Sequence, residues 1–252
     1  MKAAATASER VLSESARYTP PEHWQRVALS ELLAGTPRWN LEKPQLSFLD
    51  NLTPNRTANA FHVYVAGDVS LLKRPCVSVI GTRKVTPEGS ARARRIARDL
   101  VHAGIVVVSG LAEGVDTEAM TAAIANGGRT IGVIGTPLDK ASPSKNAALQ
   151  ETVYRDHLLV TQFAPGAQTY KSNFPQRNRL MAFVSDASVV IEASDTSGTL
   201  HQAAECSRLG RWLFIAKSVA DDKSLTWPKK FLKYETCVVL EDVKDITNRI
   251  LK

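Results

Sequence analysis

Short apolar runs alternate along most of the chain with longer segments in which apolar residues recur every three or four positions. The short runs are rich in β-branched residues and predict buried strands, whereas the recurring pattern predicts helices. The predicted strands cover residues 76–80, 105–109, 130–134, 158–163, 188–191, 212–216 and 237–240. The predicted helices cover residues 87–103, 117–126, 146–155, 173–184, 199–209 and 241–251. This alternation predicts an α/β protein with a mostly parallel, Rossmann-like sheet and helices on both faces.

The first 60 residues do not follow this alternation. Residues 1–18 are polar and rich in Ala and Ser, and favour either loose chain or a short helix. The segment at 19–22, TPPE, resembles a helix start, with a helix running toward Gly35, and residues 41–52 favour a second short helix. From residue 61 the pattern changes to an extended segment and a Gly-Asp turn. We therefore expect a helical N-terminal extension over residues 1–60 and one Rossmann-like domain over residues 61–252.

The segment at 76–103 predicts a strand, a tight turn and a basic helix in succession. Gly81 ends the strand where the chain must turn, and Pro87 suits the first turn of a helix. The apolar positions that share one helix face are Ala93, Ile96, Ala97, Leu100 and Val101. The arginines that lie off this face are Arg92, Arg94, Arg95 and Arg98. We expect these arginines to be solvated charges that add to a general positive field.

Composition narrows the class of partner. The chain has 252 residues, a net charge of +7 at pH 7 and a pI near 9.4. This balance favours an anionic partner, and a basic surface without a partner accounts for it equally well. Cys76, Cys206 and Cys237 are isolated, so we expect small buried side chains in a reducing compartment. No apolar run reaches membrane-spanning length and the N-terminus has no signal-peptide core, so we expect a cytoplasmic protein that does not enter a membrane.

Small residues cluster where four predicted strands end. These loops read GTRK at 81–84, SGLAEG at 109–114, GTPLD at 135–139 and SDTSGTLH at 194–201. Because the carboxyl ends of parallel strands share one edge, backbone N–H groups and helix N-termini at this edge can approach phosphate oxygens. The loops match neither a Walker A motif nor a GxGxxG fingerprint, so ATP hydrolysis and NAD redox chemistry lack their usual sequence support.

A second basic feature is the segment KSNFPQRNR at 171–179. It places Lys171, Phe174, Arg177 and Arg179 at the start of one predicted helix. Guanidinium groups bind phosphates in a bidentate manner, and an aromatic ring offers a stacking face for a base. The alternative interpretation is a core phenylalanine with arginines on the surface or paired with acids.

The sequence offers no convincing catalytic group. The five histidines have no metal-ligand spacing, and His201 is the best placed because it follows Ser-Gly-Thr. Asp116, Glu192 and Asp195 stand near the loops, where carboxylates usually hold the backbone in place. No base accompanies Ser109 or Ser197. We therefore expect a binding protein without catalytic residues, metal or cofactor.

Five motifs in a fixed order resemble the DNA-processing protein A (DprA/Smf) family. They are GDVSLLKRPCVSVIGTRKVTPEG, VVVSGLAEGVDTEAM, AIANGGRTIGVIG, NFPQRNRLMAFVSDASVVIEA and SGTLHQAAECSRLGR, and the match covers about residues 61–217. The resemblance implies an extended Rossmann fold and a non-enzymatic mediator that binds single-stranded DNA, helps to load RecA during natural transformation and recombination, and forms a homodimer.

The resemblance also implies the residues of the binding site. Those that match the family's motifs are Gly81, Thr82 and Arg83 in the first loop, Ser109 and Gly110 in the second, Lys171, Phe174, Arg177, Asn178 and Arg179 in the basic segment, and Ser197, Gly198 and Thr199 in the last loop. In the family they surround a pocket for the DNA backbone and bases.

The chain also departs from the family's pattern. It has Gly114-Val115-Asp116 with Ala119-Met120 where the family has Gly-Ile-Asp with Ala-His, and Lys217-Ser218 where the family has Pro-Gly. It stops at Lys252, so we expect a minimal, diverged member without the C-terminal winged helix. For such a member, a role in a mobile element or in anti-phage defence is an alternative to transformation.

Two other functions stay open at this point. One is a nucleotide sensor or a nucleoside-monophosphate phosphoribohydrolase of the same superfamily. The hydrolase motif PGGxGTxxE needs a glutamate soon after Gly-Thr, whereas here Glu205 follows Thr199 by six positions. The other is an interaction scaffold with a vestigial crevice, against which the presence of all the basic motif residues counts.

Overall fold

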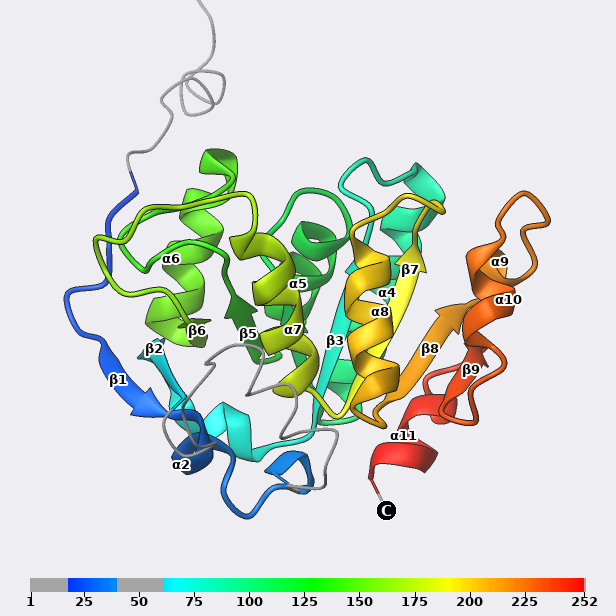
Figure 1. Cartoon of the computed structure of the whole chain (residues 1–252), viewed down its shortest axis with the longest axis horizontal. Helices are drawn as coiled ribbons and strands as arrows, with labels where there is room; N and C mark the ends of the chain where they lie inside the picture. The colour runs from blue at the N-terminus through cyan, green and yellow to red at the C-terminus, as the bar shows by residue number, and fades with distance from the viewer. Residues whose placement is uncertain (1–17, 40–60, 252) are drawn as a thin grey trace, which may run out of the picture.

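The protein is described from a computed structural model that covers residues 18–39 and 61–251. A single mixed sheet organises these residues, with strand order β1-β2-β6-β5-β4-β3-β7-β8-β9 (Figure 1). The strands are β1 (Gln25–Ala28), β2 (His62–Gly67), β3 (Cys76–Gly81), β4 (Val106–Ser109), β5 (Thr130–Val133), β6 (Leu158–Thr161), β7 (Ala187–Glu192), β8 (Trp212–Ala216) and β9 (Cys237–Leu240). All neighbours from β6 to β9 are parallel, whereas β1 and β2 are antiparallel additions at one edge. The predicted Rossmann-like, mostly parallel sheet is confirmed.

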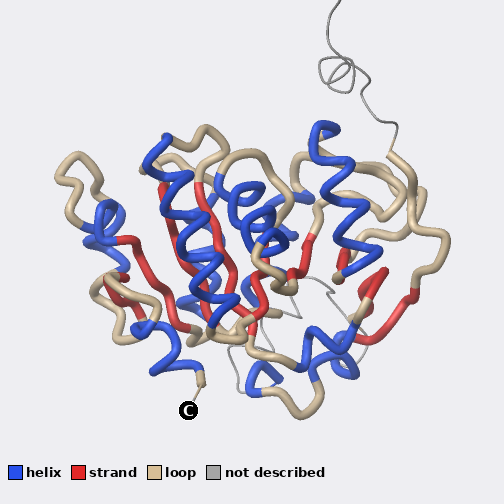
Figure 2. The backbone as a smooth tube through the Cα atoms, turned by 180° about the vertical axis from the view of Figure 1, so that it is seen from behind, coloured by secondary structure: helices blue, strands red, loops and turns tan. Residues whose placement is uncertain are grey.

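Helices cover both faces of this sheet. The α-helices are α2 (Leu29–Leu33), α4 (Pro87–His102), α5 (Val115–Ala125), α6 (Ala147–Asp156), α7 (Asn173–Phe183), α8 (Thr199–Arg208), α9 (Lys217–Ala220), α10 (Trp227–Phe231) and α11 (Lys244–Ile250). The 3₁₀ helices among the described residues are η1 (Pro37–Trp39), η3 (Val69–Lys73) and η4 (Ser144–Asn146). In Figure 1 α7 and α8 lie in front of the sheet and α4 lies behind it, and Figure 2 shows the opposite face. No helix in the described residues is both long and apolar enough to cross a bilayer.

The central strands are buried on both faces because their apolar residues point alternately to the two layers. In β3, Val77 and Val79 pack with α4 and α5, whereas Cys76 and Ile80 pack with α7 and α8. All residues of β4, β5 and β6 are buried as well. The β-branched runs therefore form inner strands for the reason that predicted them, namely that both faces of a covered parallel sheet must be apolar.

Helix α4 follows its predicted pattern closely. The Thr86 hydroxyl accepts a hydrogen bond from the Gly89 N–H at 3.0 Å, which caps the helix just before Pro87. The buried positions include Ala93, Ile96, Ala97 and Leu100. On the outer faces, Arg92, Arg94 and Arg98 pair with Glu192, Glu118 and Asp99 at 3.6, 2.6 and 3.1 Å. Arg94 and Arg98 are exposed, as predicted, whereas Arg92 is half-buried.

The N-terminal prediction is partly wrong. Residues 25–28 form strand β1 instead of the middle of a helix, because they pair antiparallel with β2 between Gln25 and Val65 and between Ala28 and His62. The helix that follows is only α2, which ends before Gly35. The predictions for residues 1–17 and for the short helix at 41–52 lie outside the described residues. The short helices α9 and α10 were not predicted.

Candidate functional site

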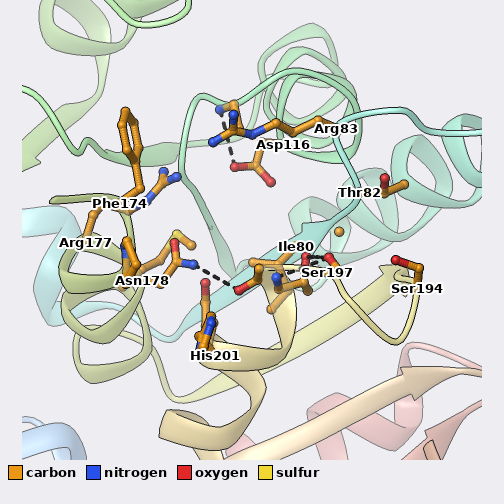
Figure 3. A pocket seen from close by; sticks show the side chains of 17 residues that line it. Ile80, Thr82, Arg83, Asp116, Phe174, Arg177, Asn178, Ser194, Ser197 and His201 are labelled. Atoms are coloured by element: carbon orange, nitrogen blue, oxygen red, sulfur yellow. Dashed lines mark hydrogen bonds between the residues drawn. The ribbon is translucent and has the colours of Figure 1, made fainter. Parts of the chain in front are cut away.

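A pocket opens where the chain reverses its direction of travel across the sheet. From β3 the chain adds β4, β5 and β6 on one side, and it then returns to add β7, β8 and β9 on the other side. Ligands of open α/β sheets bind at such a switch point, beyond the carboxyl ends of the strands. Here a cavity of about 300 Å³ lies beyond the carboxyl ends of β3 and β7, with α7 and α8 on its walls (Figure 3). Its lining comprises Ile80, Gly81, Thr82, Arg83, Ala112, Asp116, Phe174, Pro175, Arg177, Asn178, Met181, Ser194, Ser197, Gly198, Thr199, His201 and Gln202.

The loop after β3 forms one wall of the pocket and is held in place by backbone hydrogen bonds. The Thr82 N–H donates to the Glu192 carbonyl at 2.8 Å, and the Val115 N–H donates to the Thr82 carbonyl at 3.2 Å. Gly81 is required because a Cβ there would stand 2.5 Å from Val115 Cγ2. The exposed Arg83 guanidinium lies over the Phe174 ring, 5.7 Å from its centroid. An exposed cation and an aromatic ring thus meet at the mouth.

The opposite wall is the loop between β7 and α8. The Ser197 hydroxyl accepts a hydrogen bond from the Thr199 N–H at 3.2 Å and donates to Thr199 Oγ1 at 2.9 Å. Gly198 is open, since a Cβ there would have no atom within 4 Å. The Asn178 amide of α7 donates to the Gly198 carbonyl at 3.4 Å and links the two helices. The first turn of α8, the positive end of its dipole, therefore borders the pocket.

Arg177 lies at the back of the pocket and is only 5% exposed. Its guanidinium donates to the carbonyl of Gly110 and, at 3.0 Å, to the carbonyl of Val133. Asp116 accepts from the N–H groups of Gly110 at 3.0 Å and Ala112 at 3.3 Å. Burial raises the pKa of the Asp116 carboxyl, although the positive charge of Arg177 opposes this. Arg177 and Asp116 therefore hold the loop after β4 in place.

The other carboxylates near the pocket also hold loops, as predicted. Glu192 accepts from the Thr86 N–H at 3.2 Å and from the Thr86 hydroxyl at 2.6 Å. Asp195 accepts from the N–H groups of Thr226 and Trp227 at 3.1 and 2.9 Å. Each carboxylate thus ties a strand-end loop to a segment far from it in the sequence.

The structure brings most of the predicted residues together, but not all. Ser109 is fully buried and donates to the Val79 carbonyl at 2.8 Å, outside the pocket. Gly110 lines a smaller adjoining hollow of about 70 Å³, which shares Arg83 and Phe174 with the main pocket. Lys171 is exposed beyond the lining, and Arg179 pairs with Glu205 at 3.3 Å. The loop at 135–139 does not line the pocket either.

Four lining residues escaped the sequence reasoning: Ile80, Pro175, Met181 and Gln202. For Ile80, Pro175 and Met181 the sequence does not distinguish a residue that lines a pocket from one that packs in the core, because all three are apolar. Gln202 did give one, since it shares the buried face of α8 with Thr199, Ala203 and Cys206. A polar residue on an apolar helix face is the kind of exception that deserves an explanation.

Comparison with known proteins agrees with the motif resemblance. The sequence profile of a family described as DNA recombination-mediator protein A matches residues 47–251. The DNA processing protein DprA of Streptococcus pneumoniae is 37% identical over 186 residues, which make up 72% of this chain and 66% of that protein. The chain spans less than two thirds of the length of the first curated relatives that it matches.

Two solved structures share the fold over nearly the whole chain. The X-ray structure of DprA from Streptococcus pneumoniae has a TM-score of 0.71 and 27% identity, and covers 97% of this chain and 78% of its own. DprA from Helicobacter pylori, whose structure is described for its single-stranded DNA binding mode, has a TM-score of 0.69 and 25% identity. It covers 91% of this chain and 97% of its own.

Proposed function

Because the chain belongs to the DNA recombination-mediator protein A family, we propose that it binds single-stranded DNA in the pocket beyond the carboxyl ends of β3 and β7. The observation that carries the proposal is the meeting of three features at one switch point. They are the exposed cation of Arg83, the ring of Phe174 beneath it and the open N-terminus of α8 at Gly198. The described binding mode of the Helicobacter pylori protein supports the same ligand.

Each feature has a role that fits a single strand. Arg83 and the first turn of α8 contact phosphates, and the exposed Lys171 extends this positive surface. Phe174 offers a stacking face to a base, which is accessible only when the strand is unpaired. Around them, Thr82, Asn178, Ser197 and Thr199 supply polar contacts. Gly81 and Arg177 shape the walls and Gly110 lines the adjoining hollow, whereas Ser109 is bonded to Val79 outside the pocket and Arg179 is paired with Glu205.

The test is a fluorescence-anisotropy titration of single- and double-stranded oligonucleotides across a salt series. We expect Arg83→Ala to weaken single-strand binding about tenfold and to lower the salt slope by about 0.7, because one phosphate contact is lost. Arg95→Ala is the matched control, since Arg95 is an exposed arginine of α4 outside the pocket. Equal losses for both variants would mean that general charge, and not this pocket, binds the strand.

We propose that the pocket binds its ligand without cleaving it. The carboxylates nearest the pocket, Asp116 and Glu192, already accept hydrogen bonds that hold loops. Incubation with nucleoside monophosphates, followed by chromatography for a released base, tests this point. Base release that disappears in a Glu192→Gln variant would establish an enzyme instead.

The wider role proposed here is that of a cytoplasmic homodimer that passes its strand to a RecA-type recombinase. The family description as a recombination mediator supports this hand-over. Use in transformation, in general recombination, in a mobile element or in anti-phage defence would each employ the same binding step. Mass measurement in solution tests the dimer, and RecA filament formation on a strand that carries the protein tests the hand-over.

A further inference from the structure

Gln202 is a buried amide with an unused hydrogen-bonding group. It lies in the first turns of α8, lines the pocket and is 1% exposed. Its Nε2 has no hydrogen-bond partner among the described residues. The chain contains a direct comparison in Gln150, which is also 1% exposed but whose Nε2 donates to the Lys140 carbonyl at 3.0 Å. The fold therefore provides a hydrogen-bond acceptor for the amide nitrogen of Gln150 but none for that of Gln202, which lies at the pocket.

An unpartnered buried amide lowers the stability of the free protein, because its hydration is lost and nothing replaces it. A bound group that accepts a hydrogen bond from Nε2 would offset this loss. The residues that share the lining with Gln202 restrict what that group is. Ile80, Phe174 and Met181 are apolar and suit the faces of a flat ring, and Arg83, over Phe174, supplies a positive charge beside them.

We propose that Gln202 contacts the hydrogen-bonding edge of a nucleobase inserted in the pocket and so makes single-strand binding depend on base identity. A carboxamide presents a donor and an acceptor side by side, which is the arrangement that base edges complement. Phosphates and sugars are common to all nucleotides, so contacts to them alone distinguish no base. This inference rests on the proposed function and adds a specificity-determining residue to it.

The test compares binding of base-bearing and abasic strands. Anisotropy titrations at one low salt concentration use labelled oligo-dT, oligo-dC and oligo-dA, together with an abasic strand of equal length. We expect the wild type to bind its preferred homopolymer about tenfold more tightly than the least preferred. In Gln202→Met, which keeps the length but removes the amide, we expect this ratio to fall to about twofold or less, and the gap to the abasic strand to narrow.

Thermal unfolding of the free protein distinguishes this role from a structural one. If Gln202 stabilised the fold, its replacement would lower the melting temperature. Removing an unsatisfied amide leaves no buried partner unpaired, so Gln202→Met should melt at or above the temperature of the wild type. Gln150→Met is the matched control and should melt lower, because it leaves the Lys140 carbonyl without its donor. Gln202→Leu serves for both measurements if the methionine variant does not fold.

The outcomes separate this inference from the function on which it rests. If the wild type binds single strands but treats all three bases alike, or if Gln202→Met keeps the wild-type ratio, Gln202 does not read a base and only the inference fails. A lower melting temperature for Gln202→Met with an unchanged ratio would make it a structural residue. If the wild type binds none of the strands, the proposed function fails, and the inference fails with it.

Discussion

Arg177 lines the back of the pocket but is almost fully buried and bonds to backbone carbonyls, although its sequence context predicts an arginine that binds phosphates. Its guanidinium bonds with the carbonyls of Gly110 and Val133, which are 67 and 44 positions away in the sequence. Gly110 makes this possible, because a Cβ at that position would overlap Arg177 Nη1 and approach Asp116 Oδ2 to 2.7 Å. The glycine of the second loop is thus required by a buried cation.

Gly110→Ala should therefore destabilise the protein. The added methyl group displaces the guanidinium from two buried carbonyls, and hydrogen bonds to charged groups contribute about 1.5–3 kcal/mol each. We expect the free energy of unfolding in urea to fall by about 3 kcal/mol. Gly198→Ala is the matched control and should change it by less than about 0.5 kcal/mol, because the space around Gly198 is open. Equal stability of the two variants would contradict the role given to Gly110.

The sequence predicts which loops meet at the pocket better than it predicts the burial and the hydrogen-bond partners of each residue there. Thr82, Arg83, Phe174 and the Ser-Gly-Thr turn at 197–199 meet in one pocket, because strand-end loops of a parallel sheet must share an edge. The burial of Arg177 could not be foreseen, since its carbonyl partners come from two other strand ends. Gln202 could have been found, because it places an amide on an apolar helix face.

At the scale of elements, the parts that could be predicted are those with a strong local pattern. The inner strands are continuous apolar runs, and α4 has both a cap and a buried face. Strand β1 was missed because its four residues, QRVA, are too few to show an alternation and become a strand only by pairing with β2, 37 positions along the chain. Helices α9 and α10 have four and five residues, too few for a helical period to show.

A buried ion pair helps to join the N-terminal elements to the amino-terminal ends of the central strands. Arg38, in η1, is 1% exposed and donates to Asp186 at 2.7 Å and to the Arg74 carbonyl at 3.0 Å. Asp186 precedes β7 and also accepts from the Cys76 N–H, at the start of β3, at 2.8 Å. This anchor lies at the opposite end of the strands from the pocket.

Arg38→Met should lower the free energy of unfolding by about 3 kcal/mol, because Asp186 is left with a largely buried charge and one partner fewer. Asp186→Asn should lower the free energy of unfolding less in the Arg38→Met variant than in the wild type. A double-mutant cycle in urea measures this difference directly. Single-strand binding by the folded variants should match that of the wild type, since the pair is remote from the pocket. Additive losses would show that the two side chains do not act as a pair.

At the scale of the whole molecule, the interior is mostly apolar, and polar side chains within it, such as Arg38 and Ser78, are hydrogen-bonded to other groups. The three cysteines belong to that interior, as predicted, and come from three separate places: Cys76 in β3, Cys206 in α8 and Cys237 in β9. Burial raises the pKa of the Cys76 and Cys237 thiols to about 12 and that of Cys206 to about 11, from an ordinary value of 9.0. The folded protein thus keeps protons that the unfolded chain loses above pH 9.

This difference links stability to alkaline pH. Below pH 9 the thiols are protonated in both states, so their contribution is fully present, and it is lost as pH rises from 9 toward the folded pKa values. Between pH 8 and pH 10 the ionisation of each thiol in the unfolded chain should lower the free energy of unfolding by about 1.4 kcal/mol, or by about 4 kcal/mol for all three. Urea unfolding across this range measures the fall. A variant with alanine at all three positions, although less stable at pH 8, should show a shallower slope, and parallel curves would mean that the thiols do not carry the effect.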